Sequence, residues 1–494
     1  MTGQVTALSE GLQYGLAAIL VLLTVLSAQL VVVSLFRLFW PERRLRTPHL
    51  PDSALPNVLV QLPVRNEGDL ALRVARAAMA MDWPADKLEI QVLDDGDAEL
   101  HTGLMAAIKA ITPVGITVSV LKRGDRTGYK AGNLAFGLTH STAPYVAVFD
   151  ADFMPPVDFL RKTVPVLIGD AGLCFVQSRW THANRTQNWL TRVQAFLLDS
   201  HFAIEQEGRF RAGLPISFNG TAGVWRREAI ENAGGWTGDT LTEDLDLSMR
   251  CTLHGWRTAY LKDLEVPSEL PETAAAWRAQ QARWTKGHAQ CARKLLPQIW
   301  GSRLPLTFKL AMSLQMCQFA FYTLAFTSAV ISLVLMYIGA VYLQTVGILG
   351  LVVTAFGLGT SFAYVFLGQK LLGRHRAVGL HRTLLLSIIF PSGLILANTK
   401  ATMEAFFNRQ TEFTRTLRRG ERYAGAWRGA PELMVGVFLP AFTLAESAWS
   451  APFFLIAVTG LVSIGVMGFS GRSLGRSLTT TAPQPIAAPR SSRD

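Results

Sequence analysis

The chain has 494 residues, enough for more than one domain, with a formal net charge of +11 and 50% hydrophobic residues. Its mean hydropathy of +0.26 is high for a soluble protein. The basic residues cluster beside apolar segments, which favours the positive-inside bias of membrane proteins over nucleic-acid binding. The four cysteines lie far apart without a CxxC pair, which argues against a zinc site or a disulfide framework and favours a reducing compartment.

Residues 1–40 are expected to form an N-terminal transmembrane anchor. Gly11 to Phe36 is an uncharged apolar run that is long enough to span a bilayer. Arginines follow it at positions 37, 43, 44 and 46. The positive-inside bias therefore places the end of this segment in the cytoplasm.

Residues 41–305 alternate between short β-branched runs and helical stretches. The runs at 57–64, 88–93, 116–121 and 145–149 predict strands, and the stretches at 69–81 and 97–111 predict helices. This alternation predicts a parallel α/β sheet that binds its ligands at the carboxyl ends of the strands. Polar clusters fall at three of these ends: Arg65-Asn66-Glu67, Asp94-Asp95-Gly96 and Asp150-Ala151-Asp152.

The rest of the chain returns to a membrane pattern. Residues 306–370 predict two transmembrane helices, because no charged residue occurs from 310 to 369. Residues 371–430 predict interfacial helices, since the apolar stretch 383–398 is short, contains Pro391-Ser392-Gly393 and has basic residues on both sides. Residues 431–471 predict two more transmembrane helices, and 472–494 a disordered cytosolic tail. The total is five spans, with the α/β domain on the cytosolic side.

Asp150 and Asp152 are the candidate metal ligands. Two carboxylates at a strand end can hold one divalent cation, Mg²⁺ or Mn²⁺, against a diphosphate. A strand-end turn with solvated acids is the alternative. Asp94 and Asp95 could accept hydrogen bonds from a base or ribose, although Asp-Gly is also a turn signal. Lys130, after an Arg/Gly-rich loop, suits a phosphate or sugar contact or is simply a solvated lysine.

The triplet Thr242-Glu243-Asp244 provides the candidate general base, Asp244, because deprotonating a sugar hydroxyl needs a carboxylate within hydrogen-bond reach. The alternative is a helix start capped by Thr242 with two acids in its first turn. The two interpretations are compatible. About forty residues later comes Gln280-x-x-Arg283-Trp284. Here Arg283 would hold a diphosphate, and Trp284 would offer a flat face to a sugar ring or fill a core.

In this order, DDG, DAD, TED and QxxRW resemble the motifs of the processive family 2 glycosyltransferases, which include cellulose, chitin and hyaluronan synthases. The chain is more similar still to the cellulose-synthase-like glucomannan and mannan synthases. The stretches that carry this closer likeness are Gly128–Gly132, Phe149–Phe153, Val176–Trp180, Phe218–Arg226 and Ser268–Pro271.

The resemblance implies a GT-A fold, with a Rossmann-like mixed sheet, and inverting transfer that gives a β-linked product. The residue roles that it implies are nucleotide and donor contacts for Asp94, Asp95, Glu67, Lys130, Asp150, Gln280 and Arg283, acceptor contact for Trp284, metal binding for Asp152 with Asp150, and base catalysis by Asp244 with Glu243 and Thr242. A gating loop would contain Phe413, Arg415, Thr416 and Arg418. This loop departs from the family's Phe-x-Val-Thr-x-Lys pattern at its third and sixth positions.

The leading hypothesis is an integral membrane protein, in a bacterial-type inner membrane or its equivalent, that polymerises sugar from GDP-mannose or UDP-glucose. Its product would be a β-1,4-linked mannan, glucomannan or glucan, which it would also translocate. Its partners would be the donor, the growing polysaccharide and the bilayer, with no nucleic acid. One alternative is a glycolipid synthase acting on diacylglycerol or ceramide. Another is a non-catalytic binder of nucleotide sugar, against which the intact TED and QxxRW motifs argue.

Overall fold

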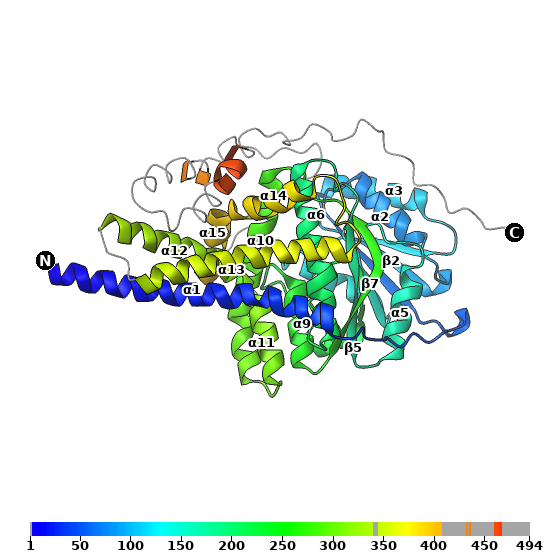
Figure 1. Ribbon diagram of the computed structural model, residues 1–494. Coiled ribbons are helices and arrows are strands. Elements are labelled where there is room, and N and C mark those ends of the chain that lie inside the picture. Colours follow the sequence, from blue (N-terminus) through cyan, green and yellow to red (C-terminus); the bar gives the residue numbers. More distant parts are fainter. Residues whose placement is uncertain (1, 339–343, 408–430, 433, 436–458, 467–494) are drawn as a thin grey trace.

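A seven-stranded mixed sheet forms the centre of the domain that follows the first helix, in the computed structural model shown in Figure 1. The structure describes residues 2–338, 344–407, 431–432, 434–435 and 459–466. The strand order is β3-β2-β1-β4-β6-β5-β7. The strands are β1 (Val58–Val64), β2 (Leu88–Asp94), β3 (Thr117–Leu121), β4 (Tyr145–Val148), β5 (Leu173–His182), β6 (Gly223–Arg226) and β7 (Arg257–Ser268).

The first four strands run parallel, as the strand–helix alternation predicts. Their bounds agree with the predicted runs to within a residue, and the predicted helices are α2 (Asp69–Met79) and α3 (Ala98–Ile111). α2 and α4 (Tyr129–Leu138) pack on β1 and β2. Val64 and Asp94 lie opposite each other at the ends of β1 and β2, so the polar residues that follow these strands begin at one edge of the sheet.

The parallel arrangement does not extend to the second half of the sheet, for which the strand–helix alternation made no prediction. β6 runs antiparallel to both β4 and β5, while β5 and β7 are parallel. The mixed sheet that the family resemblance implies is therefore confirmed. β6 has only four residues, and Trp225 in its middle packs on Phe175 and Phe218 with ring centroids 4.6 and 5.0 Å apart. Tertiary packing of this buried aromatic, more than any period in the sequence, fixes β6 between its neighbours.

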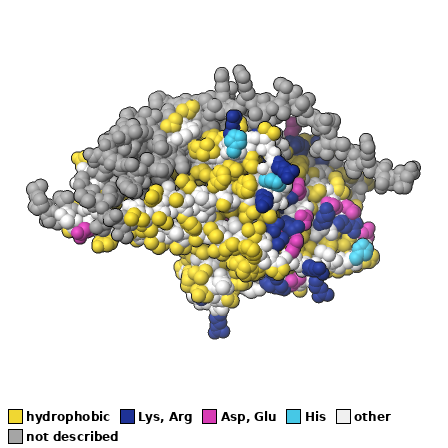
Figure 2. Space-filling view, in the orientation of Figure 1, with side chains coloured by type: hydrophobic (Ala, Val, Ile, Leu, Met, Phe, Trp, Pro, Cys, Tyr) yellow, Lys and Arg dark blue, Asp and Glu magenta, His cyan; other side chains and the backbone are white. Residues whose placement is uncertain are grey.

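Long apolar helices form the other part of the molecule. They are α1 (Thr2–Phe39), α11 (Leu306–Met316), which continues through a 3₁₀ turn into α12 (Ala320–Tyr337), and α13 (Gln344–Leu371). Among the described residues, three helical stretches are long and apolar enough to cross a membrane: Thr6–Phe39, Leu306–Leu335 and Val346–Leu371. α1 packs along α13. Figure 2 shows hydrophobic side chains over this helical part and charged side chains gathered over the sheet domain.

The segment predicted to be interfacial contains α14 (Leu380–Ser392) and α15 (Ile395–Phe406), which meet at an angle of 42°. The pair is apolar enough to form either a broken span or a re-entrant loop. Most of the two spans predicted over 431–471 lies outside the described residues. The five-span count and the predicted domain boundaries therefore stay predictions.

A buried ion cluster fastens the sheet domain to α13. Asp199, at 1% exposure on α6 (Trp189–Ser200), accepts hydrogen bonds from Arg185 at 2.6 Å, Arg374 at 2.9 Å and Gln369 at 3.1 Å. Two guanidinium groups offset the cost of burying this carboxylate. Because Gln369 lies on α13 and Arg374 three residues beyond its end, the cluster fixes the sheet domain against this apolar helix.

Candidate functional site

A cavity of about 430 Å³ opens at the carboxyl ends of β1, β2 and β4, beneath α9 (Glu243–Leu253) and α10 (Ala274–Gly301). It brings together most of the residues that the sequence singles out. These lining residues are Glu67, Asp95, Lys130, Asp150, Asp152, Thr242, Glu243, Asp244, Gln280, Arg283 and Trp284. Their common location is an observation, while the role of each stays a prediction. The four proposed gating-loop residues (413, 415, 416 and 418) lie outside the described part of the chain.

Lys130 joins the acids of β4 to those of α9. Its Nζ lies 2.6 Å from Asp150 Oδ1 and 3.8 Å from Glu243 Oε1, and it donates to the carbonyl of Gly220 at 2.9 Å. Burial alone would lower the pKa of Lys130, but the charges of Asp150 and Glu243 raise it above its usual value. The ammonium therefore stays charged at neutral pH and contributes a fixed positive charge to the cavity.

The two acids that follow β4 suit a divalent cation by their chemistry. Asp150 and Asp152 both line the cavity. The Asp150 amide donates to Thr221 Oγ1 at 2.9 Å, and this bond fixes the turn that follows β4. Among the described residues there is no group of three or more metal-binding side chains. Mg²⁺ and Mn²⁺ favour oxygen ligands, and Mg²⁺ usually takes one or two protein carboxylates with phosphate oxygens completing the set. The pair therefore fits a metal that a diphosphate helps to hold.

Asp244 lies in the first turn of α9, where the sequence places a helix start. Thr242 is at the N-cap position, but its side chain makes no capping bond there; its Oγ1 lies 3.4 Å from Cys291 Sγ on α10. Burial raises the pKa of Asp244 to about 7, the charge of Glu243 adds to this shift, and Lys130 opposes it. A carboxyl group with this pKa is suited to accept a proton near neutral pH.

Gly220 separates Asp244 from Lys130. It has a positive φ of 82°, which favours glycine. A Cβ on Gly220 would lie 3.3 Å from Asp244 Oδ2 and 3.7 Å from Lys130 Nζ. The two charged atoms are therefore within about 7 Å of each other, close enough for the ammonium to act on the carboxyl group.

The predicted Gln-x-x-Arg-Trp residues lie on one face of α10. Gln280, Arg283 and Trp284 are spaced i, i+3 and i+4, and all three line the cavity. One turn later, a Cβ on Gly287 would lie 2.5 Å from Thr242 Cγ2 and 2.6 Å from its Oγ1. The glycine thus lets the start of α9 approach α10 closely and sets the distance between Asp244 and this face.

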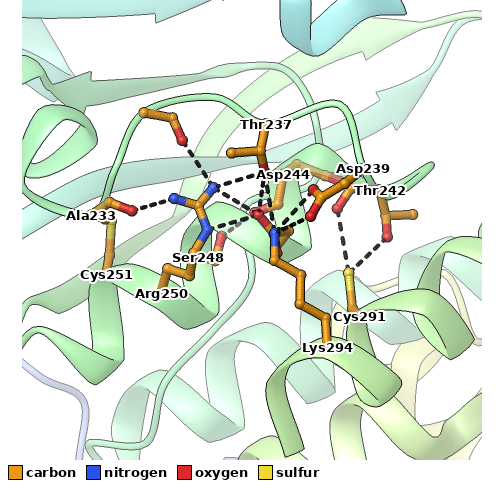
Figure 3. A network of polar contacts seen from close by, with 12 residues as sticks. Ala233, Thr237, Asp239, Thr242, Asp244, Ser248, Arg250, Cys251, Cys291 and Lys294 are labelled. Atoms are coloured by element: carbon orange, nitrogen blue, oxygen red, sulfur yellow. Dashed lines mark hydrogen bonds and ion pairs between the residues drawn. The ribbon is translucent and has the colours of Figure 1, made fainter. Parts of the chain in front are cut away.

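A buried ionic network behind the cavity holds α9 and α10 together (Figure 3). Lys294 on α10 reaches Asp246 Oδ1 and Asp239 Oδ2, both at 2.8 Å. Arg250 binds the other oxygen of Asp246 at 2.7 Å, and Thr237 donates to that oxygen at 2.9 Å. No motif in the sequence indicates this network. The i, i+4 spacing of Asp246 and Arg250 was the available signal, but it is common on ordinary helix surfaces.

The two acids at the end of β2 differ in position. Asp95 lines the cavity and receives two parallel hydrogen bonds from Arg123, at 2.8 and 2.7 Å. Asp94 is not among the lining residues; it accepts from the Gly96 amide at 2.8 Å and lies 2.7 Å from His101 Nδ1. Alternation of side chains along a strand explains why neighbouring acids diverge. Asp94 thus shapes the turn, whereas Asp95 faces the cavity.

The cavity also has polar side chains that no motif indicates. They are His201, Glu205, His288, Gln315 and Gln318. The first two belong to a π-helical segment, His201–Gln206, and Gln318 lies within the candidate membrane span Leu306–Leu335, in the 3₁₀ turn between α11 and α12. Burial opposes ionisation of Glu205, but hydrogen bonds and charge from His201 and Arg209 lower its pKa to about 2. Gln318 donates to Glu205 at 3.3 Å, so this polar wall joins the sheet domain to the long apolar helices.

Comparison with known proteins shows which proteins this chain resembles. Residues 145–358 match the model described as "Glycosyl transferase family group 2". The chain is 42% identical over 270 residues to Glucomannan 4-beta-mannosyltransferase 1 of Oryza sativa subsp. japonica, covering 52% of each chain. It is also 42% identical over 281 residues to Glucomannan 4-beta-mannosyltransferase 2 of Arabidopsis thaliana, covering 54% of this chain and 53% of that protein. The chain thus spans about half the length of these curated relatives.

A solved structure supports the fold. The mannosyltransferase PcManGT from Pyrobaculum calidifontis, in complex with GDP-Man and Mn²⁺, superposes with a TM-score of 0.55 at 17% identity. The match covers 82% of this chain and 100% of that chain. At this identity the likeness establishes a shared fold, in agreement with the expected GT-A architecture.

Proposed function

We propose that the chain, whose residues 145–358 match the model of a family 2 glycosyltransferase, is a membrane-embedded inverting mannosyltransferase. It transfers mannose from GDP-mannose to the end of a β-1,4-linked mannan or glucomannan; UDP-glucose is the alternative donor. Two observations support the sugar. The plant relatives at 42% identity are named glucomannan 4-beta-mannosyltransferases, and the fold neighbour was solved with GDP-Man and Mn²⁺.

The observation that carries this proposal is the position of Asp244. Its carboxyl group has a pKa of about 7 and shares one cavity with the Lys130–Asp150 ion pair and with Trp284. A base for the acceptor hydroxyl, a cationic group for the diphosphate and an aromatic face that can stack on a sugar ring are together suited to glycosyl transfer.

In the proposed reaction, Asp244 accepts the proton of the acceptor hydroxyl. The hydroxyl oxygen then forms a bond to the anomeric carbon as the bond from that carbon to the diphosphate oxygen breaks. Attack from the face opposite the leaving group inverts the configuration, so an α-linked donor gives a β-linked product. Lys130 and Arg283 stabilise the negative charge of the departing nucleoside diphosphate.

Asp150 and Asp152 would hold Mg²⁺ or Mn²⁺, which would offset the charge that develops on the leaving diphosphate. Asp95 and Glu67 line the other side of the cavity, where we propose that they contact the nucleotide. Asp95 is already held by the paired bonds of Arg123. A donor contact at Asp95 therefore requires no reorganisation of that side chain.

The polar wall formed by His201, Glu205, His288, Gln315 and Gln318 supports a glycan acceptor. These side chains line the same cavity as Trp284, and Gln318 lies within the candidate membrane span Leu306–Leu335. Hydroxyl-rich sugar units can satisfy such donors and acceptors, whereas acyl chains cannot. We propose that the growing glycan leaves along this wall and crosses the membrane, with the catalytic domain on the cytosolic side.

The Asp244→Asn variant tests this function. Its mannosyl transfer should fall by about 10²- to 10⁴-fold, because the amide cannot accept the proton. GDP binding, measured separately by calorimetry, should stay close to that of the unaltered protein. The matched control is Asp263→Asn, an exposed acid that does not line the cavity and should keep its transfer rate. Undiminished transfer by Asp244→Asn would contradict the assignment of the base.

A further inference from the structure

A second cavity, of about 520 Å³, lies between the segment that follows α1 and the sheet domain. Four of its lining residues are arginines: Arg43, Arg44, Arg46 and Arg257. Of its lining residues, only Asp170 is acidic. The cavity is separate from the candidate active site, because the two share no lining residue.

The segment that contains Arg43, Arg44 and Arg46 contacts the sheet domain at two points. Arg43 donates to the carbonyl of Phe210 at 3.3 Å, and its guanidinium lies 5.3 Å from the centre of the Phe210 ring. The backbone of Arg46 lies so close to Gly169, at the end of α5 (Phe159–Gly169), that a Cβ on this glycine would clash with the Arg46 carbonyl. The arginines therefore line a formed hollow rather than a free tail.

Their charges are only partly balanced by the protein. Asp170 forms its ion pair with Arg257, at 2.6 Å. Arg44 and Arg46 are exposed and make no hydrogen bond or ion pair with any described residue, and Arg43 uses a backbone carbonyl. Three of the arginines that line this hollow thus have no carboxylate partner in the part of the chain that the structure describes. Guanidinium forks match phosphate oxygens, so a phosphate-bearing anion is the ligand that suits them.

The location of this second cavity, close to the end of α1, favours the phosphate of a lipid over inorganic phosphate. α1 ends at Phe39, and the side chains of Phe39 and Trp40 are 73% and 45% exposed, as is typical of an aromatic belt at the membrane surface. Arg43 is three residues further on and so at most about 10 Å away along the chain. We propose that this cavity binds the phosphate of an anionic phospholipid headgroup in the leaflet at which α1 ends.

Binding of short-chain lipids to the purified full-length protein in neutral detergent tests the proposal. Dioctanoyl phosphatidylglycerol, dioctanoyl phosphatidylcholine and inorganic phosphate would be titrated separately by calorimetry. We expect saturable binding of phosphatidylglycerol, much weaker binding of phosphatidylcholine and still weaker binding of inorganic phosphate. The Arg44→Gln/Arg46→Gln variant should bind phosphatidylglycerol roughly tenfold or more weakly, since each basic residue near the surface contributes several-fold.

The matched control is Arg76→Gln/Lys109→Gln, which removes two exposed charges on α2 and α3, away from the cavity. It should bind phosphatidylglycerol as the unaltered protein does. An equal loss in both double variants would overturn the proposal, because binding would then follow net charge. Inorganic phosphate binding as tightly as phosphatidylglycerol would overturn the lipid assignment. Circular dichroism checks folding, and Arg44→Gln alone, with an expected loss of about fivefold, carries the test if the double variant misfolds.

Discussion

Replacing Lys130 by Met should move the pH dependence of transfer upward. The Lys130 ammonium lies within about 7 Å of Asp244 Oδ2, because both atoms are close to the Cβ position of Gly220 (3.7 and 3.3 Å). At this distance and an effective dielectric constant of about 20, the attraction is about 2 kcal/mol, or about 1.5 pKa units. Removing the positive charge would therefore raise the pKa of Asp244 from about 7 to between 8 and 9.

The direction of the predicted change in activity follows from the ionisation state of Asp244. Asp244 can accept a proton only when it is ionised, so activity rises with pH through its pKa. At pH 7 the higher pKa should reduce transfer by Lys130→Met roughly tenfold or more, in addition to any loss in donor binding. The loss caused by the pKa shift should disappear toward pH 9, where Asp244 is again ionised. Glu243→Gln should have the opposite effect, because the charge of Glu243 raises the pKa of Asp244.

The assay is kcat/KM against pH from 5.5 to 9.5, which reports the pKa values of the free enzyme. The amplitude of each profile measures donor binding and chemistry, whereas the position of its acidic limb measures Asp244. The two variants should displace this limb in opposite directions from that of the unaltered protein. Identical limbs in all three proteins, or a downward shift in Lys130→Met, would refute this account of the site.

Three further changes should have effects that the geometry specifies. The Cβ of Gly287→Ala would lie 2.5 Å from Thr242 Cγ2, so this variant should displace the start of α9 and lower kcat more than it raises the KM for the donor. The control is Gly301→Ala, whose Cβ would have no atom within 4 Å and which should match the unaltered protein in steady-state kinetics. Lys294→Met should lower thermal stability, by about 3 kcal/mol, because it removes one of the two cations that neutralise buried Asp246; unchanged melting in a thermal scan would contradict this. Chelation of divalent ions by EDTA should abolish transfer, and added Mn²⁺ or Mg²⁺ should restore it; full activity in EDTA would argue against a metal at the end of β4.

Local patterns predict the first half of the domain well. The strands β1 to β4 and the helices α2 and α3 follow from β-branched runs and helical periodicity, since each element is a contiguous segment with its own pattern, whereas α4 was not predicted. β6 could not be predicted in this way. It has four residues, and its antiparallel direction depends on the packing of Trp225 among residues distant in the chain.

The candidate site shows the same division. The motifs at strand ends and on α10 identify residues that meet in one cavity, because the ends of neighbouring strands must lie together. The sequence could not show that Asp95 faces the cavity and Asp94 the turn, since this depends on where β2 ends. His201 and Glu205 carried no distinctive signal, because their i, i+4 spacing is also that of an ordinary surface ion pair.

The most direct test of the account is the identity of the product. The purified protein in nanodiscs, with Mn²⁺, would be offered radiolabelled GDP-mannose and UDP-glucose in separate reactions. Each product would then be treated with β-mannanase, with cellulase and by organic extraction. We predict that GDP-mannose gives an insoluble product that β-mannanase degrades. A product that passes wholly into the organic phase would contradict the account and identify a glycolipid synthase instead.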